Sequence, residues 1–268
     1  MRKVLLYSGG FDSTLMLADL MRDAREEDEI IAVSVIHNLT GMCKHRREYE
    51  SQILCIRELK KRFPKARLTH EIIRVESMWN IGSTYNCKGL AQPIFWMCNI
   101  IPLLEDGDAV YTGYIKGDDA MEHLDELYQM WHYALKFQDG KDVCLKLPHR
   151  HKSKEEIIVE LIANYDYLVD HCVSCESEVF DGVSVCGDCV PCKHLKSALV
   201  QIIMNYSDND LLNRAKQLLK DKFDMEVQFT SGESKSINNT HKDDSQTITY
   251  TDEVYMDVDS RETARSTD

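Results

Sequence analysis

The sequence holds two segments whose residue types and spacing could do chemistry. The first follows an apolar run at residues 4–7 and is rich in glycine and hydroxyl side chains. Glycines let an anion approach the backbone, and the N–H groups at the start of a helix attract negative charge. A phosphate site is therefore predicted, with an ordinary N-capped Ser/Gly turn as the alternative. The segment comprises Ser8, Gly9, Gly10, Phe11, Asp12, Ser13 and Thr14.

The second segment holds five of the ten cysteines, between residues 172 and 192. Three of them recur at a spacing of three, and a fourth precedes them by a short loop, which is a ligand set for tetrahedral Zn²⁺. A set of four thiolates leaves no open coordination position, so the metal would be structural; an iron–sulfur cluster is the alternative. Cys172 competes for one position, but it belongs to an apolar stretch. The predicted ligands are Cys175, Cys186, Cys189 and Cys192.

The elements that must position these segments alternate between strand-like and helical patterns. Short apolar runs occur at residues 4–7, 30–36, 68–75, 108–112 and 143–147, and a helical pattern follows each of them, for example at residues 48–62, 121–137 and 153–163. Such alternation predicts a doubly wound α/β fold with a parallel sheet of about five strands. Ligands in this fold class bind beyond the carboxyl ends of the strands, where the phosphate segment would lie.

The chain divides into three predicted parts. Residues 1–163 form the nucleotide-binding α/β domain, and residues 164–230 form a region with the cysteine site and the C-terminal helices. Residues 231–268 are acidic and polar, and are predicted to be a mostly disordered tail. Within this tail, residues 247–258 alternate well enough to form a strand on a protein partner; a solvated tail is the alternative.

Charge and hydropathy exclude several classes of protein. The formal net charge of −13 gives no general attraction to nucleic acid. No apolar run approaches the roughly 18 residues that a membrane helix needs. We find no secretory leader pattern and therefore expect a cytoplasmic protein whose cysteines are thiols or metal ligands.

The first segment resembles the PP-loop, Ser-Gly-Gly-x-Asp-Ser, of the PP-loop ATP pyrophosphatases, which cleave ATP to AMP and pyrophosphate. Together with the cysteine pattern, it makes residues 1–205 similar to the 7-cyano-7-deazaguanine synthase family of queuosine biosynthesis, as a divergent member. The resemblance implies an adenine nucleotide α-hydrolase-like fold, with ATP, Mg²⁺ and structural Zn²⁺ as cofactors. It also implies that the loop holds pyrophosphate and that Asp12 organises the loop or its Mg²⁺.

Further site residues follow from the same resemblance. His45 lies in a basic segment similar to the one that opens the family's second helix, and would contact the nucleotide. Lys154 lies in a Ser-Lys-x-Glu-Ile segment and would reach the phosphates. Asp118 or Asp119 would bind Mg²⁺ or the substrate base, although either could simply cap a helix.

The segments that the resemblance assigns to substrate binding depart from the family pattern. Residues 90–93 read Leu-Ala-Gln-Pro where the family carries an Arg-Asn pair, and residues 112–123 lack its base-contacting segment. The resemblance implies a ligase that adenylates 7-carboxy-7-deazaguanine and converts it with ammonia to the amide or nitrile. The departures leave three alternatives open. One is a synthase-like protein of a bacterial anti-phage operon that joins a deazaguanine-type base to a protein amine. The others are another PP-loop amidation or thiolation enzyme and a zinc-stabilised scaffold. The resemblance and the apolar residues 94–104 indicate a homodimer.

Overall fold

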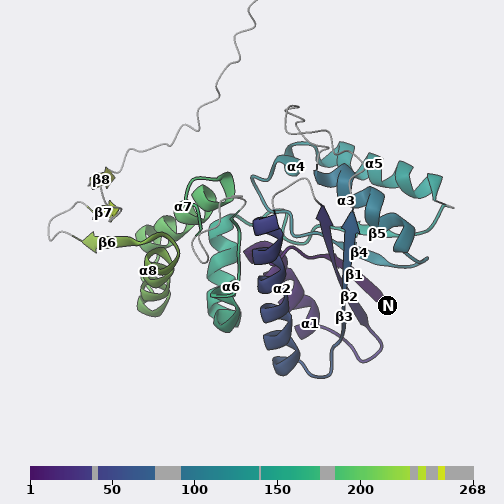
Figure 1. The fold of residues 1–268 in the computed structure, drawn as a ribbon, viewed down its shortest axis with the longest axis horizontal. Helices are drawn as coiled ribbons and strands as arrows, with labels where there is room; N and C mark the ends of the chain where they lie inside the picture. Colours follow the sequence, from purple (N-terminus) through teal and green to yellow (C-terminus); the bar gives the residue numbers. More distant parts are fainter. Residues whose placement is uncertain are drawn as a thin grey trace, which may run out of the picture.

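The centre of the molecule is a five-stranded parallel sheet with the strand order β3-β2-β1-β4-β5 (Figure 1). The order reverses between β1 and β4, so the crevice at their carboxyl ends is the topological switch point, where such sheets bind ligands. The strands are β1 (Arg2–Leu6), β2 (Glu29–His37), β3 (Arg67–Val75), β4 (Ala109–Tyr111) and β5 (Cys144–Lys146). This computed structural model describes residues 1–37, 42–75, 92–138, 140–175, 185–229, 235–239 and 247–250.

Helices cover both faces of the sheet and create two hydrophobic clusters. One cluster packs α1 (Phe11–Arg22), α2 (Met42–Arg62) and α6 (Lys154–Val169) against one face. The other packs α3 (Gln92–Ile100) and α5 (Leu124–Phe137) against the opposite face. Central strands of the sheet are buried on both sides, which explains why their sequences are continuous apolar runs. The predicted doubly wound α/β fold is confirmed.

Three helices differ in detail from the sequence prediction. α2 begins at Met42, six residues before the predicted start. The prediction missed these residues because they are polar and basic and carry no apolar period. The helix predicted at 121–137 is interrupted at His123, whose φ of −122° and ψ of 39° are not helical. The interruption separates α5 from the short α4 (Asp119–Glu122). α6 runs past residue 163 to Val169, with a break at Tyr165.

The C-terminal helices extend the core of the α/β domain. α7 (Val190–Asn205) packs between α6 and α8 (Asn209–Phe223), and their buried side chains belong to the same cluster as those of α1 (Figure 1). The apolar core is therefore continuous across the boundary predicted at residues 163 and 164.

A second, antiparallel sheet follows α8. It contains β6 (Met225–Phe229), β7 (Lys235–Asn239) and β8 (Thr247–Tyr250). β8 covers the first part of the segment predicted to form a strand on a partner, and here it pairs with β7 of its own chain; residues 251–258 lie outside the described residues. None of the helices in the described ranges combines the length and apolarity needed to cross a membrane.

Candidate functional site

The phosphate loop, residues 8–14, lies between β1 and α1 at the carboxyl edge of the sheet. Gly10 is the N-cap of α1, and no side chain caps the helix. The first N–H groups of a helix have no partners within it, so an uncapped N-terminus offers donors to an anion. The hydroxyls of Ser8 and Ser13 lie 3.1 Å apart beside these donors.

Gly9 gives the loop its turn, with a φ of +80° that disfavours any other residue. Its carbonyl oxygen accepts two hydrogen bonds from outside the loop, from the hydroxyl of Ser51 at 2.7 Å and from the N–H of Val173 at 3.2 Å. Sequence reasoning missed both residues, because neither lies in a motif and Val173 acts through its backbone.

Lys154 reaches the loop from the start of α6. Its Nζ lies 2.6 Å from Oδ2 of Asp12, although the two residues are 142 positions apart in the sequence. A capping box fixes the end of the helix that carries Lys154: the hydroxyl of Ser153 accepts from the N–H of Glu156, and the carboxylate of Glu156 accepts from the N–H of Ser153. The structure thus joins two residues that the sequence predicted separately.

Asp118 belongs to the same charged group, whereas Asp119 does not. Burial raises the pKa of the Asp118 carboxyl, a hydrogen bond from the N–H of Ile115 lowers it, and the charge of Asp12 raises it. The charge of Lys154 lowers it again, as does His194 in its protonated form, and the shift that remains is upward. Asp119 is exposed in the first turn of α4. His194, on α7, is a titratable neighbour that the sequence did not indicate.

Gly113, at the end of β4, touches the loop across the switch point. A Cβ atom at this position would lie 3.0 Å from the backbone N of Ser13 and 3.2 Å from the carbonyl carbon of Asp12. Only glycine permits this approach without displacement of the helix. The segment after β4 therefore packs directly against the phosphate loop.

Two polar atoms in this crevice suit a ligand. Oδ1 of Asp12 and Oγ1 of Thr112 are buried and, among the described residues, have no hydrogen-bond partner. A buried acceptor without a partner is costly, and a carboxylate oxygen is the ligand that Mg²⁺ prefers. The residues present therefore fit a magnesium ion at Asp12.

The four predicted cysteine ligands come together at the start of α7. Their Sγ atoms all lie within 4.8 Å of one another, and those of Cys186 and Cys192 are 4.0 Å apart. Zinc–sulfur bonds of about 2.3 Å require thiolates about 3.8 Å apart in a tetrahedron. Cys172 is not in the group, since its Sγ contacts the carbonyl oxygen of Leu168 at 3.4 Å.

The surroundings of this cluster favour a thiolate at Cys186 and disfavour one at Cys192, where burial raises the pKa of the thiol. Burial raises the pKa of the Cys186 thiol, but hydrogen bonds from the N–H groups of Cys189 and Asp188 bring it down to about 6. The Sγ of Cys175 accepts from the guanidinium of Arg47 at 3.6 Å. Donors directed at sulfur stabilise its negative charge, which is the form that binds a metal.

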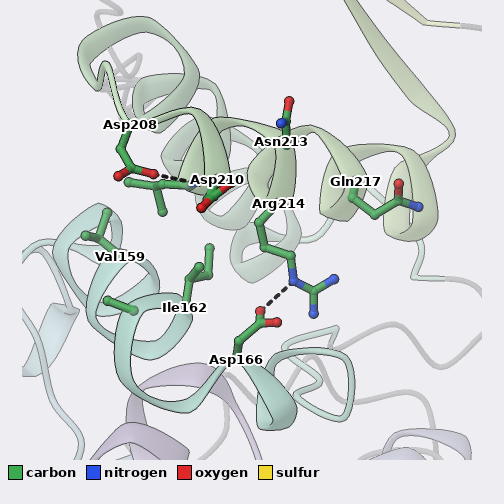
Figure 2. Close-up of a pocket in the computed structure, with 10 residues that line it drawn as sticks. Val159, Ile162, Asp166, Asp208, Asp210, Asn213, Arg214 and Gln217 are labelled. Atoms are coloured by element: carbon green, nitrogen blue, oxygen red, sulfur yellow. Dashed lines mark hydrogen bonds and ion pairs between the residues drawn. The ribbon is translucent and has the colours of Figure 1, made fainter.

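Other predicted residues are not brought to the site by the described structure. His45 lies on α2, but its side chain is outside the described residues, as are residues 90 and 91. A cavity of about 730 Å³ opens between α6 and α8, away from the loop (Figure 2). Arg214 lines it and pairs with Asp166 at 2.6 Å, and Asp208 caps α8, so these three charged groups are used in structural contacts.

Comparison with known proteins gives distant structural likenesses. No family model and no curated protein matches the chain. Among solved structures, the U34-tRNA thiolase NcsA from Methanococcus maripaludis, with its [4Fe-4S] cluster, is 12% identical with a TM-score of 0.43, over 82% of this chain and 73% of that one. NMN synthetase from Francisella tularensis is 13% identical with a TM-score of 0.33, over 80% of this chain and 82% of that one. Neither likeness assigns a family or a reaction.

Proposed function

We propose that this chain is a PP-loop ATP pyrophosphatase that adenylates a carboxylate, with release of pyrophosphate and then AMP. The observation that carries the proposal is the ion pair of 2.6 Å between Lys154 and Asp12 at an uncapped helix N-terminus. The N–H groups of the loop bind the β- and γ-phosphates of ATP. Lys154 offsets the negative charge that develops as pyrophosphate leaves. The acyl-adenylate is then attacked by an amine.

Mg²⁺, when bound, supplies positive charge that stabilises the departing pyrophosphate. Oδ1 of Asp12 is the proposed ligand, because it is buried and lacks a hydrogen-bond partner among the described residues. Asp118, whose pKa is raised by burial, lies close enough to feel the charges of Asp12 and Lys154. Its proposed role is to orient the substrate base or the metal from the N-cap position of α4.

The proposed metal of the cysteine cluster is zinc in a structural role. Support comes from Sγ atoms that all lie within 4.8 Å of one another, which suits one ion with four bonds. In a cubane iron–sulfur cluster each thiolate binds a different iron, so the sulfurs stand further apart. The ligands would be Cys175, Cys186, Cys189 and Cys192.

The proposed carboxylate is 7-carboxy-7-deazaguanine or a related deazapurine, with ammonia as the amine. Support is the order of motifs in the sequence, a PP-loop first and Cys-Gly-x-Cys-x-x-Cys after the last strand of the parallel sheet. The changed segment 112–123 favours, as second candidate, transfer of a deazaguanine-type base to a protein amine, in the manner of an anti-phage synthase-like protein. Amidation or thiolation of another substrate is the third.

The test is a reaction with ATP, Mg²⁺, ammonium and 7-carboxy-7-deazaguanine, followed by mass spectrometry of small molecules and of intact protein. The proposal predicts AMP with an amide or nitrile product. AMP without that product, or a mass increase on a protein, would move the assignment to another acceptor. Absence of ATP cleavage with every acceptor would refute the proposal that this chain is an ATP pyrophosphatase.

A matched pair of lysine variants makes this test specific. Lys154→Ala removes the cation at the loop and should lower the rate of AMP formation by about 10²- to 10³-fold. Lys152→Ala removes a cation two residues earlier that instead pairs with Glu160 at 2.5 Å, and should leave the reaction rate within about twofold.

A further inference from the structure

The carbonyl oxygen of Gly9 is held by two groups that lie outside the phosphate loop. Ser51, on α2, donates its hydroxyl at 2.7 Å, and Val173 donates its N–H at 3.2 Å. The N–H and C=O of a trans peptide point in opposite directions. Holding the carbonyl of Gly9 therefore directs the N–H of Gly10 the other way, where it meets the hydroxyl of Ser8 at 3.3 Å.

This orientation decides whether the loop attracts or repels an anion. A backbone N–H directed at the binding position attracts phosphate, whereas a carbonyl oxygen there repels it. Gly9 has no Cβ to restrict the peptide, and its φ of +80° is one of several that glycine adopts readily. The two external hydrogen bonds thus supply the restraint that the loop's own sequence lacks.

Val173 belongs to a short strap that leads to the cysteine cluster. We define the strap as residues 172–175; its last residue, Cys175, is one of the four clustered thiols. The strap lies against the loop, since a Cβ on Gly10 would be 3.5 Å from the carbonyl oxygen of Val173. Lys222 of α8 fixes its other end by donating to the carbonyl of Cys172 at 3.0 Å.

Ser51 is also linked to the cluster. Arg47 precedes it by one helical turn on α2, so the two side chains share one face of the helix. The guanidinium of Arg47 donates to the Sγ of Cys175 at 3.6 Å. Cys175 is therefore connected to the carbonyl oxygen of Gly9 in two ways. One connection is the strap, and the other is α2 with its residues Arg47 and Ser51.

We propose that Ser51 and the strap are positioning elements that orient the Gly9–Gly10 peptide for pyrophosphate, so that metal binding at the cysteine cluster and pyrophosphate binding at the loop strengthen each other. This inference rests on the proposed phosphate site. A metal bound to Cys175 holds the strap in place, and the ordering of Val173 is then complete before the anion arrives. Coupling of two binding equilibria is reciprocal, so pyrophosphate must in turn retain the metal.

The first experiment uses the unmodified protein and measures its affinity for zinc. Zinc-loaded protein is titrated with the chelating dye 4-(2-pyridylazo)resorcinol, and the absorbance of the zinc–dye complex at equilibrium is compared with and without inorganic pyrophosphate. A control titration with a zinc-binding peptide corrects for any competition by pyrophosphate itself. We expect the apparent affinity for zinc to rise at least threefold at saturating pyrophosphate. Equal affinities at saturation would overturn the proposed coupling.

The second experiment compares two buried serines by calorimetric titration with pyrophosphate. Ser51 and Ser34 are each 2% exposed and each donate to a backbone carbonyl at 2.7 Å, but Ser34 binds the carbonyl of Tyr7, before the loop. Ser51→Ala should lower the affinity for pyrophosphate about fivefold, which corresponds to the loss of one ordinary hydrogen bond. Ser51→Thr should restore most of that affinity. Ser34→Ala should change the affinity less than twofold.

These outcomes separate the inference from the function on which it rests. Equal weakening by Ser51→Ala and Ser34→Ala would reduce Ser51 to a general packing role and overturn the positioning proposal, with the phosphate site intact. Failure of the unmodified, zinc-loaded protein to bind pyrophosphate at all would refute the phosphate site and the inference together.

Discussion

The phosphate loop and the cysteine cluster lie side by side but are held in different ways. The loop is fixed by hydrogen bonds from distant parts of the chain, including Ser51, Val173 and the Lys154–Asp12 pair. The cluster gathers four sulfur atoms within 4.8 Å, an arrangement that becomes favourable for thiolates when a cation lies between them. One site is built by the fold before its ligand binds, whereas the other is expected to depend on its proposed metal for stability. The predictions below test this contrast.

The largest effect is expected from loss of a cysteine ligand. Cys189→Ser should abolish stoichiometric zinc and lower the melting temperature by more than about 10 °C, because structural zinc contributes folding free energy directly. Cys98→Ser, which changes an exposed cysteine outside the cluster, is the control and should retain both metal and stability. Metal analysis by mass spectrometry and thermal unfolding measure the two properties. A stable Cys189→Ser protein with full zinc would show that the cluster is not a metal site.

Removal of the loop cation should affect the reaction and spare the fold. Lys154→Ala should lower the rate of pyrophosphate release by about 10²- to 10³-fold, since a charge aimed at the leaving group is lost. Its melting temperature should stay within a few degrees, because the ion pair with Asp12 is partly solvated. A coupled pyrophosphate assay measures the rate, and thermal unfolding measures the melting temperature. A collapse of stability would mean that the fold of the loop depends on this one ion pair.

Loss of a helix cap should have a smaller effect on both properties. Ser153→Ala removes the cap of α6 and should cost about 1 kcal/mol in urea unfolding. Because Lys154 is the next residue, the KM for ATP should also rise several-fold. Asp208→Ala removes the cap of α8, where Asp208 accepts from the N–H of Leu211 at 2.8 Å, and should cost similar stability without a change in KM. Equal KM values for the two variants would contradict the positioning of Lys154 by its cap.

The smallest effect concerns the pH dependence of stability. The pKa of Asp118 is raised in the folded state above its usual value of 3.8, so folding favours the protonated form. Its contribution is fully present below pH 3.8 and is lost as the pH rises through the folded pKa. Asp118→Asn should therefore raise the melting temperature slightly at pH 7, and by less at pH 3. Asp119→Asn, an exposed change beside it, should show no such trend.

The contiguous parts of the fold and site were predictable from the sequence. Strand-like runs and helical periods gave the sheet, and residues 8–14 form one uninterrupted segment whose glycines and hydroxyls indicate anion binding. The cysteine spacing indicated which thiols meet. Lys154 required the family resemblance, because a lysine at a helix start is otherwise an ordinary surface charge.

The remaining features could not be predicted, for physical reasons. Val173 acts through a backbone N–H that almost any residue would supply, and Ser51 is one serine on a long polar helix. The break at Tyr165 involves no proline or glycine, so nothing local marks it; the hydroxyl of Tyr165 is held by tertiary contacts with Asp19 and Arg22. These contacts join residues more than 140 positions apart.

The distance in sequence between Asp12 and Lys154 has a consequence for the newly made chain. The phosphate loop is translated long before Lys154 and Val173, two of the groups that hold it, which follow 142 or more positions later. Long-range contacts cost loop-closure entropy and form slowly. During synthesis β1 can pair with β2 early, but its other edge must wait for β4, and the loop must wait longer, until α6 and the strap have been translated. The unpaired edge of β1 is exposed to misassociation until β4 has been translated, and protection by a chaperone would matter during that interval.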